Sequence, residues 1–158
     1  MRLPVGVRQI RGENYRDEDY PHKELTEKII GCAIRVHRAL RAGFVEVIYE
    51  NALAHELAKS GLHGMRQVKY PVFYDGVQVG EHRADMVVDG KVVVELKAAS
   101  GVTDQHVSQV MSTMIAARME VGLLLNFGEA KLVDGLRRIV IQKKDSPVLP
   151  SEDSAPLR

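Results

Sequence analysis

The sequence is poor in cysteine, which limits both its covalent cross-links and its metal sites. Cys32 is the only cysteine among the 158 residues. A single thiol cannot form a disulfide or a multi-cysteine zinc site within one chain. Cys32 also stands in a helical pattern, where it is typical of a small core residue. Because nothing in the cysteine usage calls for an oxidising compartment, we expect a cytoplasmic protein.

Long apolar runs and an excess of one charge are also absent. The longest apolar stretches are too short to span a bilayer, and the first 20 residues contain neither the apolar core nor the cleavage site of a secretory signal. The formal net charge is +1. This balance argues against a polybasic nucleic-acid binder, although the acids of a metal site can offset a basic groove in the total. We therefore expect no membrane association.

The remaining composition is that of one ordinary domain. Apolar residues make up 45% of the chain and charged residues 27%, as in most soluble globular proteins. Residues 1–22 are polar and lack a clear period, so we predict an N-terminal arm there. Residues 146–158 contain three of the six prolines and are predicted to be a flexible tail. A single domain is expected over residues 23–145.

Apolar periodicity predicts a mixed α/β order for this domain. Spacing of three and four residues predicts helices, and alternating or continuous β-branched residues predict strands. The order is ααβββαββ, an α/β sandwich in which a mixed sheet carries helices on its faces. The helices are expected at 24–44, 45–62 and 103–120, and the strands at 66–76, 77–90, 91–98, 121–128 and 136–142.

The stretch DMVVDGKVVVELK, residues 85–97, joins the most apolar part of the chain to three charged residues. Leaving an unpaired charge in a dry interior costs several kcal/mol. Asp85, Glu95 and Lys97 therefore need a reason to stand in a segment that reads as buried sheet.

The turn between the two strands decides whether the two acids share a face. A two-residue loop at 89–90 would send Asp85 and Glu95 to opposite faces. A three-residue loop at 88–90 puts Val93 opposite Asp85, and the two acids then share a face because the side-chain period of a strand is two. The last residue of this loop is a glycine, as such a turn requires. We predict the three-residue loop, or a bulge with the same effect.

Two acids and a lysine on one patch of sheet would form a metal-dependent site. Neighbouring carboxylates repel, and one of them keeps a proton unless a cation lies between them. Mg²⁺ prefers one or two carboxylates together with waters and phosphate oxygens. A lysine there can orient a water and stabilise the charge that builds up on phosphorus. A Glu-x-Lys triplet alone is more often a solvated strand end, but Asp85 in the apolar hairpin supports the metal site.

Asp85, followed by Glu95-x-Lys97 on the next strand, resembles the PD-(D/E)XK nuclease superfamily. The segment GFVEVIYE is similar to the signature of the GxxExxY protein family within this superfamily. Three further segments resemble other parts of that family: LTEKIIGCAIRVHRAL, HVSQV and VGLLLNFGEAKLVDGLRRIV. The resemblance covers residues 25–140. It implies a restriction-endonuclease-like sandwich, with a mixed sheet flanked by helices.

The resemblance also implies a role for each matching residue. The ligands of Mg²⁺ or Mn²⁺ would be Asp85, Glu95 and the backbone carbonyl of Leu96. The catalytic residues would be Lys97, which positions the attacking water, with Glu46 and Gln109 in support. The candidates for substrate contacts are Arg83, His106 and Tyr49. Arg83 could instead form a salt bridge, His106 could be a half-exposed helix residue, and Tyr49 could be a packing residue.

The chain departs from the family pattern at three places. Arg41–Ala42 stands where Gly-Pro is common, and Ala84 precedes Asp85 in place of the proline in the superfamily name. An aromatic residue commonly follows the helix glutamine by four positions, where this chain has Thr113. The last departure concerns the fine geometry of the substrate groove and not the metal site.

These features together imply a metal-dependent phosphodiesterase that hydrolyses nucleic acid, with DNA preferred over RNA. Two alternatives stay open. The first is a catalytically inactive nuclease-fold module that binds nucleic acid or a protein partner. The second is a metal enzyme that acts on another phosphate ester. A homodimer through an exposed sheet edge or helix face also stays open.

Overall fold

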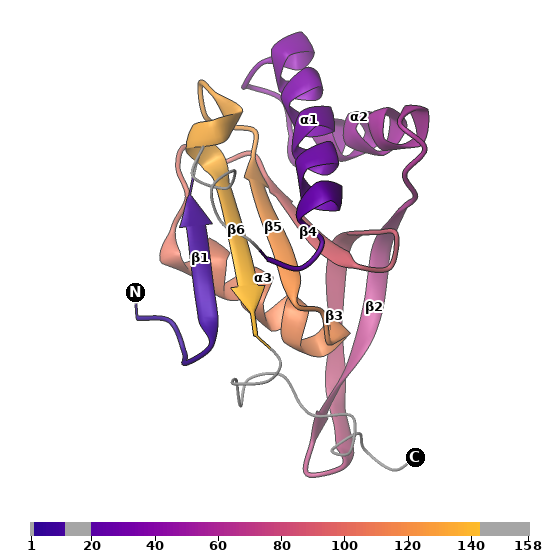
Figure 1. Ribbon diagram of the computed structural model, residues 1–158, viewed down its shortest axis with the longest axis vertical. Coiled ribbons are helices and arrows are strands. Elements are labelled where there is room, and N and C mark those ends of the chain that lie inside the picture. Colours follow the sequence, from indigo (N-terminus) through magenta and orange to yellow (C-terminus); the bar gives the residue numbers. More distant parts are fainter. Residues whose placement is uncertain (1, 12–19, 143–158) are drawn as a thin grey trace.

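The computed structural model describes residues 2–11 and 20–142, and its elements follow the predicted order from the first helix onward (Figure 1). This confirms a mixed sheet flanked by helices. The elements are β1 (Val7–Arg11), α1 (Lys23–Leu40), α2 (Glu46–Lys59), β2 (Gly64–Tyr74), β3 (Val77–Val88), β4 (Val92–Lys97), α3 (Asp104–Ala117), β5 (Val121–Asn126), the short 3-10 helix η2 (Leu132–Gly135) and β6 (Leu136–Ile141).

The sheet has six strands in the order β1-β6-β5-β4-β3-β2. The strands β4 and β5 pair in parallel, and every other neighbouring pair is antiparallel. A parallel pair needs a crossover connection, which α3 supplies between β4 and β5. The valine-rich β4 is buried from Val92 to Leu96, as expected of a strand with both faces covered.

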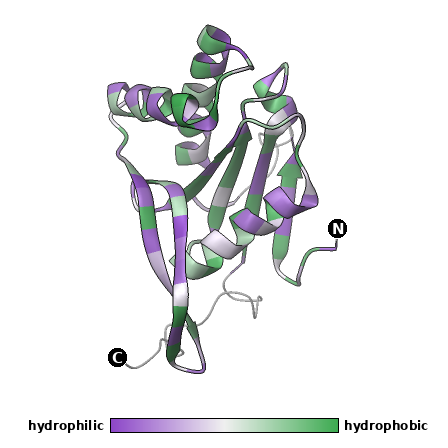
Figure 2. Cartoon of the chain, turned by 180° about the vertical axis from the view of Figure 1, so that it is seen from behind, coloured by the Kyte–Doolittle hydropathy of each residue, from purple (hydrophilic) through white to green (hydrophobic). Residues whose placement is uncertain are grey.

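The helices cover both faces of the sheet, so that the core has two parts. Figure 1 shows α1 in front of the strands and α3 behind them, and Figure 2, the view from behind, shows α3 in front. Val92, Val94 and Leu96 pack on the side of α1 and α2, whereas Val93 packs on the side of α3. Because successive side chains of a strand alternate between faces, the odd-numbered residues of β4, including Glu95 and Lys97, belong to the α3 side.

The predicted N-terminal arm is wrong for residues 7–11, which form β1. This strand pairs antiparallel with β6, and both Val7 and Ile10 are buried. The two apolar residues are three positions apart, so the segment lacks the period-two pattern of a strand, and its pairing partner comes from the other end of the chain. The predicted tail at 146–158 lies outside the described residues.

The hairpin of β2 and β3 extends well beyond the rest of the sheet (Figure 1). Its turn is at Asp75 and Gly76, both with positive φ. The longest described helix, α1, has 18 residues, and neither it nor any other helix in the described ranges is apolar enough to cross a membrane.

Candidate active site

The turn between β3 and β4 sets the register on which the site depends. It consists of residues 89–91, because Val88 pairs with Val92, and the N–H of Lys91 donates to the carbonyl of Val88 at 3.0 Å. The predicted loop had the right length but began one residue too early. Extending the observed register of Met86 with Val94 by one residue puts Glu95, rather than Val93, opposite Asp85.

This turn is held by the loop that precedes β2. Asp89 and Gly90 have φ values of 52° and 65°, in the left-handed region where glycine carries no steric penalty. The backbone N–H of His63 donates to the carboxylate of Asp89 at 2.8 Å, and the N–H of Asp89 donates to the carbonyl of His63 at 2.8 Å. A non-glycine residue is thus stabilised at positive φ, and the odd loop length is fixed.

Asp85 and Glu95 form a pair of carboxyl groups in which Glu95 is buried and Asp85 is half-buried. Glu95 is 7% exposed. Burial raises its pKa to about 8, and a hydrogen bond with Asp85 and the charge of Asp85 add to this rise. The pair therefore holds a proton near neutral pH, because two adjacent charges in a poorly solvated place repel. Lys97, two residues further along β4, acts in the opposite direction on the pKa of Glu95.

Asp85 also ends the ladder between β3 and β4. The backbone N–H of Leu96 donates to Oδ2 of Asp85 at 3.0 Å, beyond the last strand pair of Met86 with Val94. A side-chain carboxylate thus takes the place of a strand carbonyl where the two strands part. The main chain between Glu95 and Lys97 is thereby brought against the acid pair.

Thr113 and His82 extend the site in a way that the sequence did not reveal. Thr113 is buried on α3, and its hydroxyl lies 2.8 Å from Oε1 of Glu95 and 2.7 Å from Nε2 of His82. The hydroxyl donates to Glu95, which partly offsets the rise in the pKa of that group. The departure from the family pattern at position 113 therefore supplies a hydrogen bond that a phenylalanine could not make.

Lys97 is held at its position by the end of β5. The N–H of Phe127 donates to the carbonyl of Lys97 at 2.8 Å. The buried amide of Asn126 accepts from the N–H of Ala99 at 2.9 Å and donates to its carbonyl at 3.0 Å. At Gly128, a Cβ would lie only 2.0 Å from the carbonyl oxygen of Ala99, so no larger residue fits. We call these bonds of Asn126 to the backbone of Ala99 the Asn126 clamp. The sequence signal for it was a polar residue within the apolar run LLLNFG.

Glu46 begins α2 and lies within the electrostatic field of the acid pair. Partial burial raises its pKa, and the charge of Asp85 adds to the rise, while Lys97 acts in the opposite direction. Tyr49, one turn further, is completely buried and stacks on Phe127 with 4.7 Å between ring centroids. Glu46 is therefore carried by a helix turn that is anchored in the core.

Tyr49 fixes the loop before α2 rather than facing the substrate. Its hydroxyl donates to the carbonyl of Arg41 and accepts from the N–H of Phe44. Gly43, with φ of 126°, lies inside this loop. The prediction of a substrate contact by Tyr49 does not fit a side chain with no exposed surface, and the packing alternative agrees with the geometry.

The other predicted site residues, His106, Arg83 and Gln109, differ in their contacts and exposure. His106 and Thr103 form the capping box of α3, in which Nδ1 of His106 accepts from the N–H of Thr103 at 3.1 Å. Burial lowers the pKa of His106, and the charge of Lys97 lowers it further. Arg83 is exposed and acts on the pKa of Glu46. Gln109 is exposed on α3, and no hydrogen bond joins its side chain to Lys97 among the contacts of the described residues.

The donor groups at the acid pair suit a hard divalent cation. No cluster of three or more His, Cys, Asp or Glu side chains in residues 2–11 and 20–142 is arranged to hold a metal. Two carboxylates, with waters and phosphate oxygens, are nevertheless the usual ligand set of Mg²⁺. The raised pKa of Glu95 reflects its burial and its repulsion with Asp85, and a bound cation would relieve this repulsion.

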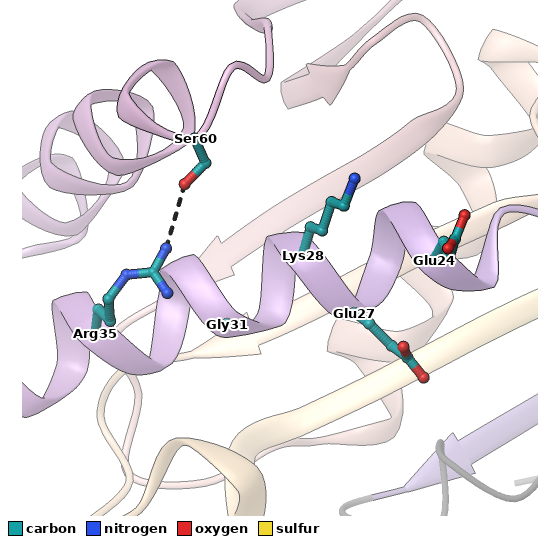
Figure 3. A pocket seen from close by; sticks show the side chains of 6 residues that line it. All are labelled: Glu24, Glu27, Lys28, Gly31, Arg35 and Ser60. Atoms are coloured by element: carbon teal, nitrogen blue, oxygen red, sulfur yellow. Dashed lines mark hydrogen bonds between the residues drawn. The ribbon is translucent and has the colours of Figure 1, made fainter.

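A surface hollow of about 410 Å³ lies elsewhere, on α1 and the end of α2 (Figure 3). Its lining consists of Glu24, Glu27, Lys28, Gly31, Arg35 and Ser60. Arg35 donates to the hydroxyl of Ser60 at 3.3 Å, as the dashed line in Figure 3 shows. None of the acid pair, Lys97 or Glu46 lines this hollow, so it is separate from the candidate active site.

The family model described as PD-(D/E)XK nuclease superfamily matches residues 23–139. No curated protein and no solved structure matches the chain. The matched range runs from the start of α1 into β6 and includes every residue of the candidate site.

Proposed function

Because the chain belongs to the PD-(D/E)XK nuclease superfamily, we propose that it is a Mg²⁺- or Mn²⁺-dependent nuclease that hydrolyses phosphodiester bonds, with DNA preferred over RNA. Within the superfamily, we assign it to the GxxExxY family on the signature of Gly43, Glu46 and Tyr49.

One observation carries this proposal. The carboxyls of Asp85 and Glu95 face each other across two strands, and burial together with Asp85 raises the pKa of Glu95 to about 8. A stabilising core would not retain two acids that must share a proton. A divalent cation between them would remove this repulsion, and because Mg²⁺ also binds phosphate oxygens, the arrangement favours a phosphate-ester substrate.

Each residue then has a defined task. Asp85, Glu95 and the backbone carbonyl of Leu96 hold the cation, which when bound polarises the phosphoryl oxygen and lowers the pKa of the attacking water. Lys97 orients that water and stabilises negative charge on the phosphoryl group. Glu46 accepts a hydrogen bond from the water.

Supporting contacts come from the surrounding helices and strands. Gln109 braces the water from α3, since its side chain makes no hydrogen bond to Lys97 among the described residues. Arg83 and His106 border the site and contact the flanking phosphates. Because such contacts release counterions, substrate binding weakens as the salt concentration rises.

The test compares wild type with Lys97→Ala and Glu95→Gln on single- and double-stranded DNA and RNA, with Mg²⁺ or Mn²⁺. Both variants should lose about 100-fold or more of the cleavage rate, because they remove groups that act on the reacting phosphate. Lys91→Ala is a matched control, since Lys91 is an exposed lysine just before the other end of β4. It should cleave like wild type.

Two results would reject the proposal. If wild type cleaves no nucleic acid with either metal, the alternative of an inactive nuclease-fold binding module takes its place. If Lys97→Ala and Lys91→Ala cleave equally well, the catalytic assignment is wrong even though the protein is a nuclease.

A further inference from the structure

Exposed apolar side chains surround Glu46 at the beginning of α2. Of the nine large apolar side chains that are exposed in the described part of the chain, four lie within residues 44–48. We call these four residues the apolar rim. They are Phe44 (47% exposed), Val45 (65%), Val47 (55%) and Ile48 (37%). Single exposed apolar residues are common, but a contiguous group is typical of a binding surface.

The buried core contacts of α2 do not come from these side chains. The core contacts of α2 are made by Tyr49, Leu53 and Leu57. Val45 occupies the N-cap of the helix and makes no side-chain cap hydrogen bond. Ser, Thr, Asp or Asn at this position would satisfy a free N–H and stabilise the helix, as Thr103 does for α3. The sequence thus keeps an apolar residue where a polar one would be the more stable choice.

The apolar rim is continuous with the candidate active site and is held in a fixed position. Phe44 packs against Tyr49, and Tyr49 stacks on Phe127. The N–H of Phe127 donates to the carbonyl of Lys97 at 2.8 Å. Glu46 lies between Val45 and Val47, and the charges of Asp85 and Lys97 act on its pKa. The N–H of Phe44 donates to the hydroxyl of Tyr49 at 3.1 Å. The two rings meet nearly edge-on, with 6.3 Å between centroids and an interplanar angle of 68°. A polymer with its scissile phosphate at the acid pair would therefore extend across this surface.

The chemistry of nucleic acid limits what can lie there. A duplex presents phosphates and sugars outward and keeps the faces of its bases stacked. Only unpaired nucleotides offer an apolar face, and a protein aromatic ring stacks on such a face without regard to sequence. On the basis of the proposed function, we propose that the apolar rim binds the unpaired bases beside the scissile phosphate, so that the substrate is single-stranded DNA.

Binding is measured by fluorescence anisotropy in the Lys97→Ala background, which prevents cleavage. The probes are a labelled single-stranded DNA, the blunt duplex of the same sequence and the matching single-stranded RNA. The single-stranded DNA should bind more tightly than the duplex and the RNA. Phe44→Ala should weaken binding of single-stranded DNA about tenfold, the usual loss for one base–aromatic stack, and leave duplex binding unchanged.

Two further variants separate binding from folding. Val45→Ser removes apolar surface but provides a capping hydroxyl, so it should weaken binding of single-stranded DNA while keeping or raising the melting temperature. Tyr74→Ala is the matched control, because Tyr74 is 75% exposed at the far end of the β2–β3 hairpin, opposite to α2 in Figure 1. It should change neither binding constant.

Equal affinity for the strand and the duplex, or an equal loss with both in Phe44→Ala, would overturn the inference. Tighter binding of the RNA strand would overturn the choice of DNA. A concentration-dependent dimer that Val45→Ser abolishes, with no change in DNA binding, would make the rim an interface between copies. These outcomes are independent of the proposed function, since a protein that binds the strand through Phe44 but cleaves nothing would contradict only the nuclease activity.

Discussion

The carboxyl of Glu95 couples the stability of the fold to pH. Burial, reinforced by Asp85, raises its pKa from 4.5 to about 8, so the folded chain binds this proton more tightly than the unfolded chain. The stability that this group contributes is fully present below its pKa in the unfolded chain, and it is lost as the pH rises towards the folded pKa of about 8. In chelator, the melting temperature should fall between about pH 5 and pH 8, by roughly 3 °C for each kcal/mol lost.

Glu95→Gln should abolish this slope, since the amide mimics the protonated acid at every pH. The control is Glu56→Gln, which changes a partly exposed glutamate that pairs with Arg35. This variant should keep the dependence of the melting temperature on pH. Added Mg²⁺ at pH 8 should raise the melting temperature of wild type and not of Glu95→Gln. A slope that survives in Glu95→Gln would show that another group controls the pH dependence. Calorimetric scans across this pH range measure all three effects.

At the scale of elements, the position of Lys97 depends on the end of β5. Asn126→Ala removes the hydrogen bonds to both backbone groups of Ala99 and the one from the N–H of Gly128. Unfolding by urea should then need less denaturant, with a loss of about 1–3 kcal/mol for the backbone groups left unpaired. Cleavage should fall more than this loss of folded protein explains, because the loop after Lys97 is then held less firmly, although Lys97 keeps the bond from the N–H of Phe127.

Asn51→Ala is the matched control for the Asn126→Ala variant. Asn51 is exposed on α2, where its side chain bonds to Arg66, and its loss should change the urea midpoint little. A wild-type midpoint and a wild-type cleavage rate in Asn126→Ala would mean that the loop after β4 does not depend on this amide.

The elements from α1 to β6 could be predicted because their periodicity is local. The strand β1 could not, since its short segment has no period of its own and becomes a strand only by pairing with β6. The turn at 89–91 was misplaced by one residue because its position depends on two hydrogen bonds with His63, which no local pattern encodes.

The acid pair was identifiable from residue types and spacing, but its surroundings were not. Thr113 lies opposite Glu95 only because α3 packs across the sheet. The same packing gives His82 its partner. Tyr49 carries a signature that resembles a functional motif, yet its burial assigns it to the loop before α2. Side chains that meet through the packing of distant elements leave no trace in linear spacing.

At the scale of the molecule, β1 protects an edge of the sheet. Deleting residues 1–11 would expose the hydrogen-bonding edge of β6, a template for pairing with other chains. It would also remove Val7 and Ile10 from the core, each worth about 1.5–3 kcal/mol when fully buried. We expect a lower melting temperature and concentration-dependent aggregation, measured by light scattering during thermal unfolding.

A shorter deletion, of residues 1 and 2, is the control, because it leaves in place β1, the bond from Val7 to the carbonyl of Pro4, and Leu3, which packs against the core. It should melt and scatter like wild type. Identical behaviour of the two deletions would show that the sheet is complete without β1.

The carboxylate of Asp85 has a second consequence, which concerns how the site communicates with its scaffold. One of its oxygens is committed to the N–H of Leu96, so any pull on Asp85 from a bound charge is transmitted to the backbone between Glu95 and Lys97. An alanine at this position would remove a proposed ligand and the hydrogen bond to Leu96 together, whereas asparagine preserves an acceptor for that bond. A charge bound at the proposed site would therefore act on the separation of β3 and β4 through this hydrogen bond, and hydrogen exchange at the amide of Leu96 would report it.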